Sequence, residues 1–167
     1  MLGLTSPVAA SRVPLLVPSL CGDGETIVYS CSFGASYGSL CGSKGKLSYR
    51  FGPLGRPAID IASDATWSNV RTGTIVGGGS GYQNHVRFTR GRFDYIVFEA
   101  MGGRYTEVSG KRWSGIQVDK DGNGVANLTC KGRATLAPPG FSDLTRYMPR
   151  GVAGTTDEPD DRHDMWY

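Results

Sequence analysis

The sequence predicts an all-β protein, a small antiparallel β-barrel or sandwich of about eight strands with few helices. Strand-like segments recur at intervals of about 8–12 residues, and the chain sustains no helical period of hydrophobic residues. Glycine occurs 25 times in 167 residues, which favours many tight turns. Four cysteines, an even number in a small and loop-rich chain, predict a disulfide framework and an oxidising compartment.

Apolar residues alternate with polar ones along the expected strands, as they do when one face of a sheet is buried. The expected strands are residues 26–33, 47–51, 58–62, 74–76, 82–89, 92–100, 113–118 and 125–130. Arg90-Gly91 joins two of these strands in an expected β-hairpin, and residues 119–124 join the last two. Residues 93–98 are the most apolar segment and are expected to form the central strand.

The chain divides into three expected parts: a lead of residues 1–22, a β domain of residues 23–135, and an irregular C-terminal tail of residues 136–167. The lead resembles a secretory signal because it has apolar segments and small residues, although prolines interrupt it and a basic start is missing. No apolar run reaches the roughly 18 residues that span a bilayer, so we expect no transmembrane segment. Together with the cysteines, the lead predicts a periplasmic or secreted protein.

Charge is divided unevenly along the chain. The net charge is +3, and residues 155–167 contain five acidic residues and one arginine, so this segment carries −4 and the rest of the chain +7. The five acidic residues are Asp157, Glu158, Asp160, Asp161 and Asp164. A basic body with an acidic tail is compatible with a polyanion-binding module. The alternative is a basic body with a solvated terminus.

Cys21, Cys31 and Cys41 lie ten residues apart, and Cys130 ends the last expected strand. Four cysteines allow three pairings, and the sequence alone does not choose among them. A hairpin centred near Ser36 would place Cys31 opposite Cys41 and leave Cys21 to pair with Cys130, so we favour this pairing. The spacings are not C-x-x-C and no histidine lies near them, so we expect no metal site. Buried free thiols are the alternative for a cytosolic protein.

Two segments resemble ligand-binding loops. Residues 119–124 match the first half of a calcium loop, but its twelfth position, which should be a glutamate, is Cys130. Residues 77–82 are glycine-rich like a phosphate-binding loop, but they contain no lysine and precede an expected strand. We therefore expect a hairpin turn at the first segment, a flexible loop at the second, and no cofactor.

His85 is the histidine inside the expected β domain. A general base needs a positioned nucleophile and an orienting carboxylate, and no nearby pattern supplies them. We therefore identify no catalytic residue, and a hydrolase is the alternative class rather than the expected one. Arginines interleaved with aromatic residues, such as Arg87 beside Phe88, resemble a surface for single-stranded nucleic acid. The cysteine usage and the signal-like lead argue against a nucleic-acid partner.

Five short segments together resemble a family of small, exported, uncharacterised proteobacterial proteins. The similarity covers about residues 25–132. The segments are Tyr29-Ser30-Cys31, Ser39-Leu40-Cys41, Leu47-Ser48-Tyr49-Arg50-Phe51-Gly52, Gly77-Gly78-Gly79 and Tyr95-Ile96-Val97. The resemblance implies a periplasmic β protein.

Ser80-Gly81-Tyr82 and the later Phe88-Thr89-Arg90-Gly91 resemble the signature of the MliC/PliC lysozyme inhibitors. In that family a Ser-Gly turn and a Lys-Gly turn of a small antiparallel β-barrel present a serine and a lysine to the active-site carboxylates of lysozyme. The resemblance implies that Ser80 forms the hydrogen bond and that Arg90 stands in place of the lysine.

We therefore expect a non-enzymatic envelope protein that binds a partner or ligand through its loops, with a lysozyme as the partner that the second resemblance implies. Loops on a rigid β scaffold are the usual place for binding residues, and the candidate loops are residues 77–82, 90–92 and 102–112. The candidate binding residues are Ser80, Tyr82, Arg90 and Arg92.

Overall fold

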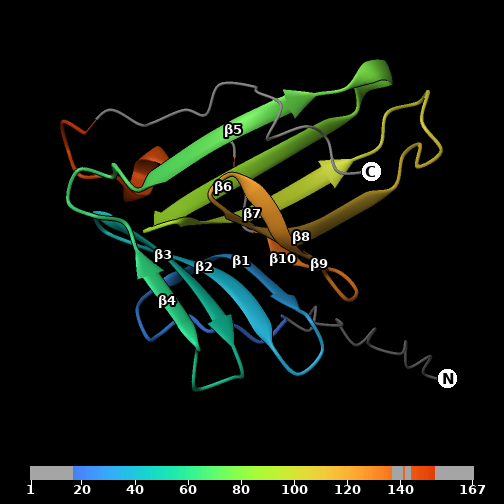
Figure 1. Ribbon diagram of the computed structural model, residues 1–167. Helices are drawn as coiled ribbons and strands as arrows, with labels where there is room; N and C mark the ends of the chain where they lie inside the picture. Colours follow the sequence, from blue (N-terminus) through green and yellow to red (C-terminus); the bar gives the residue numbers. More distant parts are fainter. Residues whose placement is uncertain (1–16, 137–140, 142–143, 153–167) are drawn as a thin grey trace, which may run out of the picture.

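The chain forms two five-stranded antiparallel sheets that pack as a sandwich, seen in a computed structural model that describes residues 17–136, 141 and 144–152 (Figure 1). The first sheet has the order β10-β1-β2-β3-β4 and consists of β1 (Thr26–Ser32), β2 (Tyr37–Ser43), β3 (Lys46–Gly52), β4 (Ile59–Ala62) and β10 (Thr135–Leu136). The second sheet has the order β5-β6-β7-β8-β9 and consists of β5 (Val70–Val76), β6 (Tyr82–Arg90), β7 (Phe93–Met101), β8 (Arg112–Lys120) and β9 (Asn123–Thr129). Two short 3₁₀ turns, η1 (Gly78–Ser80) and η2 (Thr145–Tyr147), complete the described elements.

The predicted all-β class is confirmed, and of the two predicted architectures the protein adopts the sandwich and not a closed barrel. Both predicted hairpins are present, and the most apolar segment forms β7, the central strand of its sheet. Asp121 and Gly122 form the β8–β9 turn with φ angles of 52° and 76°. Two successive positive φ angles define a type I′ turn, whose twist suits a two-residue hairpin. The predicted hairpin at 119–124 is therefore confirmed.

The core lies between the sheets and takes side chains from both. The inward residues of the first sheet include Tyr29, Leu40, Leu47 and Tyr49, and those of the second include Val86, Phe88, Val97 and Ile116. All eight are at most 1 % exposed. Burial of one such side chain stabilises the fold by about 1.5–3 kcal/mol, so this double layer is the main source of stability.

The C-terminal tail contributes to the same core. Phe141, Leu144 and Tyr147 are buried and belong to the core cluster, although this part of the chain forms only a 3₁₀ turn. The Tyr147 ring lies so close to Gly42 of β2 that a side chain at this position would overlap it. At least part of residues 136–167 is therefore packed onto the β domain.

The disulfides join Cys21 to Cys41 and Cys31 to Cys130, so the favoured pairing is wrong. The β1–β2 turn is centred earlier than Ser36, and the resulting register pairs Cys31 with Gly38. Cys41 lies three residues beyond Gly38, about 10 Å along the strand. Because side chains alternate between faces, an odd offset places Cys31 and Cys41 on opposite faces of the sheet, where they cannot bond.

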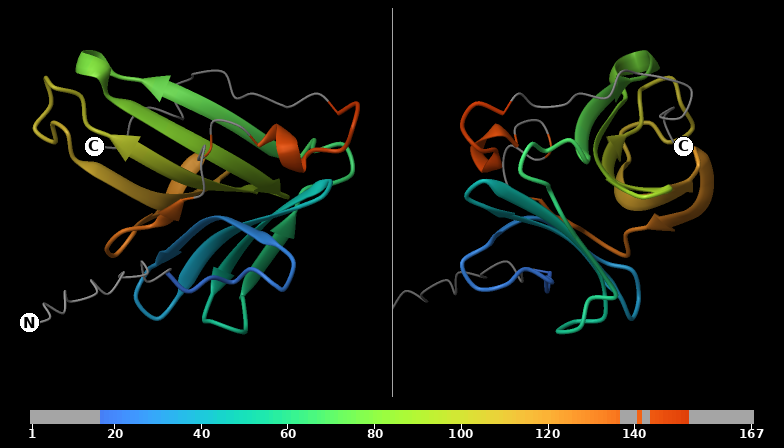
Figure 2. Two further views of the ribbon diagram at one scale, coloured as in Figure 1. Left: turned by 180° about the vertical axis from the view of Figure 1, so that it is seen from behind. Right: turned by 60° about the vertical axis from the view of Figure 1, so that its left-hand side comes forward.

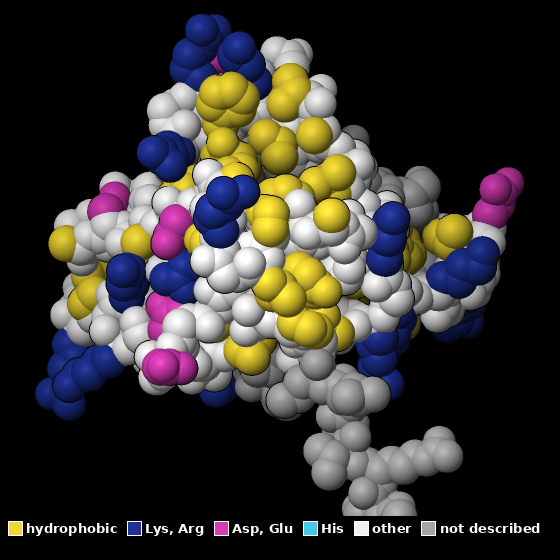
Figure 3. Space-filling model, turned by 90° about the horizontal axis from the view of Figure 1, so that it is seen from below, with side chains coloured by type: hydrophobic (Ala, Val, Ile, Leu, Met, Phe, Trp, Pro, Cys, Tyr) yellow, Lys and Arg dark blue, Asp and Glu magenta, His cyan; other side chains and the backbone are white. Residues whose placement is uncertain are grey.

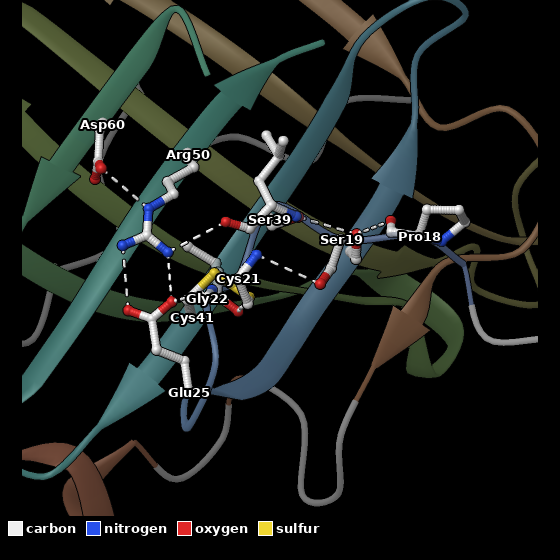
Figure 4. Close-up of a disulfide and its surroundings, with 12 residues drawn as sticks. Pro18, Ser19, Cys21, Gly22, Glu25, Ser39, Cys41, Arg50 and Asp60 are labelled. Atoms are coloured by element: carbon white, nitrogen blue, oxygen red, sulfur yellow. Dashed lines mark hydrogen bonds and ion pairs between the residues drawn. A yellow bond between two sulfur atoms is a disulfide. The ribbon is translucent and has the colours of Figure 1, made fainter. Parts of the chain in front are cut away.

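The described end of the lead is attached to the outer face of the first sheet (Figure 4). Leu20 N donates to Ser39 Oγ at 3.0 Å, and Ser30 Oγ donates to the Pro18 carbonyl at 2.8 Å. The Cys21–Cys41 disulfide, with a Cα–Cα distance of 5.3 Å, makes the attachment covalent. Residues 17–22 thus lie along this sheet, whereas residues 1–16 lie outside the described part of the chain.

Arg50 of β3 joins the lead to the edge of the first sheet. Its guanidinium forms a two-pronged ion pair with the Glu25 carboxylate and also bonds Asp60 of β4 at 3.0 Å. The ion pair lowers the pKa of the Glu25 carboxyl, mainly through the hydrogen bond from Arg50. This charged cluster holds the turn that follows Cys21 against the sheet.

The second sheet is strongly curled (Figure 2). Its convex face packs against the first sheet, and the face turned away from the first sheet is concave. Strong twist and curl are ordinary for a long antiparallel sheet. The two faces of this sheet consequently offer different environments.

Candidate functional site

A cleft of about 330 Å³ opens between the two sheets beside β8. One wall is formed by β7 and β8, and the other by Tyr29 of β1 and residues 132–136. Ligand sites of small molecules usually begin at about 300 Å³, so this cleft has room for one small molecule.

Ala100 and Trp113 contribute to the wall on the second sheet, and strand alternation explains why its other residues are polar. Val97 and Ile116 are paired across β7 and β8 and are buried against the first sheet. Two residues further along the same face, Glu99 is paired with Ser114, and Arg112 follows at the start of β8. The inner face of this sheet thus changes from apolar to polar at the cleft.

The other wall is a crossover segment, residues 130–136, which carries the chain from the second sheet back to the first. Cys130 N donates to the Ser114 carbonyl at 2.9 Å, and Lys131 N donates to the Ser32 carbonyl at 2.8 Å. The Cys31–Cys130 disulfide ties the same point to β1, with a Cα–Cα distance of 5.8 Å. The segment then joins the first sheet as β10. The cleft therefore lies where two sheets and a covalent bridge meet.

Two exposed arginines, Arg112 and Arg133, come to the cleft from its two walls. Arg112 Nη1 donates to the Tyr82 hydroxyl at 3.2 Å. The lining carboxylate, Glu99, accepts a hydrogen bond from Asn84 Nδ2 at 2.8 Å. In the part of the chain that the structure describes, neither arginine forms an ion pair. Both guanidinium groups are therefore available to an anion.

Tyr29 and Ser114 form the polar floor of the cleft. Their hydroxyl oxygens lie 3.3 Å apart, and Tyr29 is fully buried. Burial raises the pKa of the Tyr29 phenol to about 12, so the phenol is protonated at neutral pH and can donate. The partner of Ser114 is thus a neutral phenol and not a base, an arrangement that suits binding better than nucleophilic catalysis.

Apolar groups complete the lining. Ala134 and Leu136 of the crossover segment line the cleft on the side of the first sheet. They are partly buried and pack against the core cluster. A cleft with an apolar wall and two cations at its opening matches an amphipathic anion.

The structure places the four predicted binding residues at opposite ends of β6. Tyr82 begins this strand next to Arg112, and Ser80 lies just before it in η1. Arg90 ends the strand, and Arg92 follows in the turn, where its Nε lies 2.7 Å from an Asp121 oxygen. Nine extended residues span roughly 27–30 Å. Ser80 and Arg90, the two contacts that the lysozyme-inhibitor resemblance implies, therefore lie at opposite ends of β6.

Two of the three candidate loops meet. Arg104 N donates to the Gly79 carbonyl at 2.9 Å, so the loops 77–82 and 102–112 lie side by side at the end of β6. Tyr105 is 80 % exposed there, and the Arg104 guanidinium lies over its ring. The loop 90–92 lies at the other end of the strand. A binding surface made from loops would thus use the first two and not the third.

His85 does not approach the cleft. It is buried at 2 % exposure and is paired with Phe98, on the face of the second sheet that alternation turns away from the first sheet. One group of possible metal ligands occurs among the described residues, formed by Cys21, Glu25 and Cys41. Its two sulfur atoms are joined in a disulfide, so neither is a thiolate that could bind a metal, and the charge of its carboxylate is balanced by Arg50.

Basic side chains do not form one patch on the face of the first sheet. Seen from below, hydrophobic side chains gather near the centre, and most Lys and Arg side chains lie towards the periphery (Figure 3). A polyanion-binding surface usually concentrates cations along one stripe or groove. This face gives no support to the polyanion alternative.

Sequence reasoning included Arg112 only as the last residue of the candidate loop 102–112, and it did not identify Arg133 or Glu99 as binding residues. Arg133 follows Cys130 by three residues. Its position close to a cysteine was the one sequence feature that could have indicated Arg133. The convergence of these residues depends on which strands pair, and alternation within one strand does not reveal it.

A search of protein-family models, curated proteins and solved structures finds no match to this chain. Within the described residues, no helix is long and apolar enough to cross a membrane. The two disulfides are compatible with a location outside the cytoplasm.

Proposed function

We propose that this is a non-enzymatic binding protein of the periplasm or the extracellular space, and that it binds a small amphipathic anion in the cleft beside β8. The observation that carries the proposal is that Arg112 and Arg133, from two different walls, line one cleft. Guanidinium groups bind carboxylates with paired, charge-assisted hydrogen bonds, and two of them would fix the position of an anionic group.

The apolar wall defines the rest of the ligand. An alkyl or aryl body could pack against Ala134 and Leu136 while its carboxylate reached the two arginines. The buried Tyr29 hydroxyl could donate to a polar atom at the floor. Because both arginines are exposed, the attraction should be moderate and should weaken with salt.

The two disulfides support the proposed compartment. Both bridges persist in an oxidising environment and would be reduced in an ordinary cytosol. The signal-like lead of the sequence supports export, and its residues 1–16 lie outside the described part of the chain. We therefore propose the periplasm or a secreted location.

Isothermal titration calorimetry with small aryl and alkyl carboxylates tests the proposal, each compared with its neutral amide. We expect each carboxylate that binds to do so at least about tenfold more tightly than its amide, since a charge-assisted contact is worth about 1.5–3 kcal/mol. Arg112→Gln with Arg133→Gln should remove this preference. Arg92→Gln is the matched control because Arg92 is an exposed arginine far from the cleft.

Equal affinity for carboxylates and amides, or an unchanged preference in the double variant, would reject the anion site. Absence of binding to the whole series would reject it as well. The lysozyme partner remains a prediction of the resemblance alone. Lysozyme turnover measured with the protein in stoichiometric excess tests that prediction, and unchanged turnover rejects it.

A further inference from the structure

The part of the concave face that β6 and β7 form is buried, although the first sheet does not cover it, whereas Arg71 of β5 on the same face is exposed. Its side chains come from β6 and β7: Gln83, His85, Arg87, Ile96, Phe98 and Ala100. Each is at most 9 % exposed, and none belongs to the core cluster between the sheets. Because charged and amide side chains are rarely this buried on an open surface, another part of the chain is expected to pack on this face.

No described strand or helix lies over this face (Figure 2). Residues 17–25 run along the outer face of the first sheet, held there by the Cys21–Cys41 bridge. Phe141 and the turn η2 pack into the core between the sheets. The loops 77–82 and 102–112 lie together at one end of β6. The described strands and turns therefore do not account for this burial.

The charges on the concave face indicate which segment of the chain would bind there. The face carries Arg71 directly opposite Arg87, and two like charges in this position repel each other. Arg87 also lies 3.5 Å from Asp94 on the same face, and Asp119 lies beyond Asp94 on β8. The Arg71–Arg87 pair favours an anionic neighbour. Residues 153–167 carry −4, whereas the single charge in residues 1–16 is Arg12.

Length permits the contact. The 15 residues that follow Val152 can span up to about 50 Å when extended. A nine-residue strand is about 30 Å long, so the segment can reach any part of the face. The aromatic side chains Phe98 and Trp113 also lie on the concave face, and the segment ends in Trp166-Tyr167. Aromatic pairs of this kind add about 0.5–1.5 kcal/mol beyond area burial.

We propose that residues 153–167 dock on the concave face of the second sheet, with acidic side chains at Arg71 and Arg87 and the aromatic end against Phe98 and Trp113. The acidic tail is then an internal ligand of the fold. This proposal does not rest on ligand binding in the cleft, although Ala100 and Trp113 of the same strands also line that cleft.

Photo-crosslinking in the full chain tests the position of the tail. Benzoylphenylalanine replaces Trp166, and mass spectrometry identifies the crosslinked peptide after irradiation. We expect crosslinks to residues 82–87, 94–100 or 113–117, which carry the concave face. Crosslinks to the outer face of the first sheet, to the crossover segment or to another molecule would overturn the proposal, as would the absence of crosslinks.

Hydrogen exchange in the full chain tests the charge contact. We expect the amides of residues 153–167 to exchange at least about tenfold faster in Arg71→Glu than in the parent protein. Arg90→Glu is the matched control, because Arg90 is exposed on the same sheet but belongs to the inner face. Exchange at unprotected rates in the parent protein, or equal acceleration in both variants, would contradict docking at Arg71.

Discussion

Cys31 and Cys41 belong to paired strands of one hairpin, yet their side chains point to opposite faces of the sheet. Cys31 faces the core and bonds Cys130 of the crossover segment. Cys41 faces outward and bonds Cys21 of the lead. One bridge therefore joins the two sheets, and the other fastens a surface segment to a single sheet.

This difference predicts unequal effects on stability. The Cys31–Cys130 bridge closes a loop of 99 residues and the Cys21–Cys41 bridge a loop of 20. In the chain-entropy description these loops correspond to about 5 and about 3 kcal/mol. We expect Cys31→Ala/Cys130→Ala to lose more free energy of unfolding than Cys21→Ala/Cys41→Ala in urea titrations without reductant. The opposite order would show that the sheet-to-sheet bridge is not the main constraint.

The connectivity itself can be read directly. Chymotrypsin cleaves after aromatic residues, and Tyr29 and Tyr37 separate the first three cysteines. Mass spectrometry of the unreduced digest should find Cys21 linked to Cys41 and Cys31 linked to Cys130. A peptide that links Cys31 to Cys41 would contradict the strand register.

Glu25 should make stability depend on pH in the acidic range. Arg50 lowers the pKa of the Glu25 carboxyl below its ordinary value of 4.5, so the folded state holds this proton less tightly than the unfolded state. The contribution is complete above pH 4.5 and is lost as the pH falls through the lowered folded-state pKa. We expect Glu25→Gln to cost about 1–2 kcal/mol at pH 7, and this difference from the parent should vanish in acid.

Asp60→Asn is the matched control for this measurement. Asp60 bonds the same arginine but its side chain is 52 % exposed, so its loss should cost no more than about 0.5 kcal/mol. Urea unfolding of the parent and both variants between neutral and acid pH gives the comparison. A constant difference between parent and Glu25→Gln at every pH would show that the ion pair does not stabilise the fold.

Substitution of Gly42 tests whether the C-terminal segment packs onto β2. A methyl group at this position would overlap the Tyr147 ring, which is buried at 8 % exposure. We expect Gly42→Ala to destabilise the protein by about 1–3 kcal/mol because the ring must move. Gly78→Ala is the control, since no atom lies within 4 Å of its added methyl group. Equal stability of the two variants in urea would mean that Tyr147 does not occupy this place.

The sequence predicts the sheets well because alternation and turn chemistry are local. It predicts seven of the ten strands closely and the presence of both long hairpins. It misses β2, whose glycines and serines give no hydrophobic pattern. The glycines are there for a long-range reason: at Gly38 a side chain would come within 2.5 Å of Ile116 on the second sheet. The local sequence pattern does not show that a residue must be small because the other sheet packs against it.

The sequence does not predict the disulfide pairing or the cleft, for a related reason. With the turn centred at Ser36, Cys31 and Cys41 would share one face, but the turn is centred between residues 34 and 35 and they lie on opposite faces. The sequence does not locate the turn so closely. Arg112 and Arg133 converge only because the crossover segment leaves the second sheet and joins β1. Tyr82 was predicted as a binding residue, and it does lie beside Arg112.

The central claim is that an anion binds between Arg112 and Arg133, and a titration followed by ¹H–¹⁵N correlation spectra tests it most directly. With 3-phenylpropionate as the ligand, we expect saturable shifts at residues 99, 112–114 and 132–136, and much smaller shifts with 3-phenylpropionamide. Shifts confined to the concave face or to the loop 90–92, or no shifts with either compound, would contradict the claim.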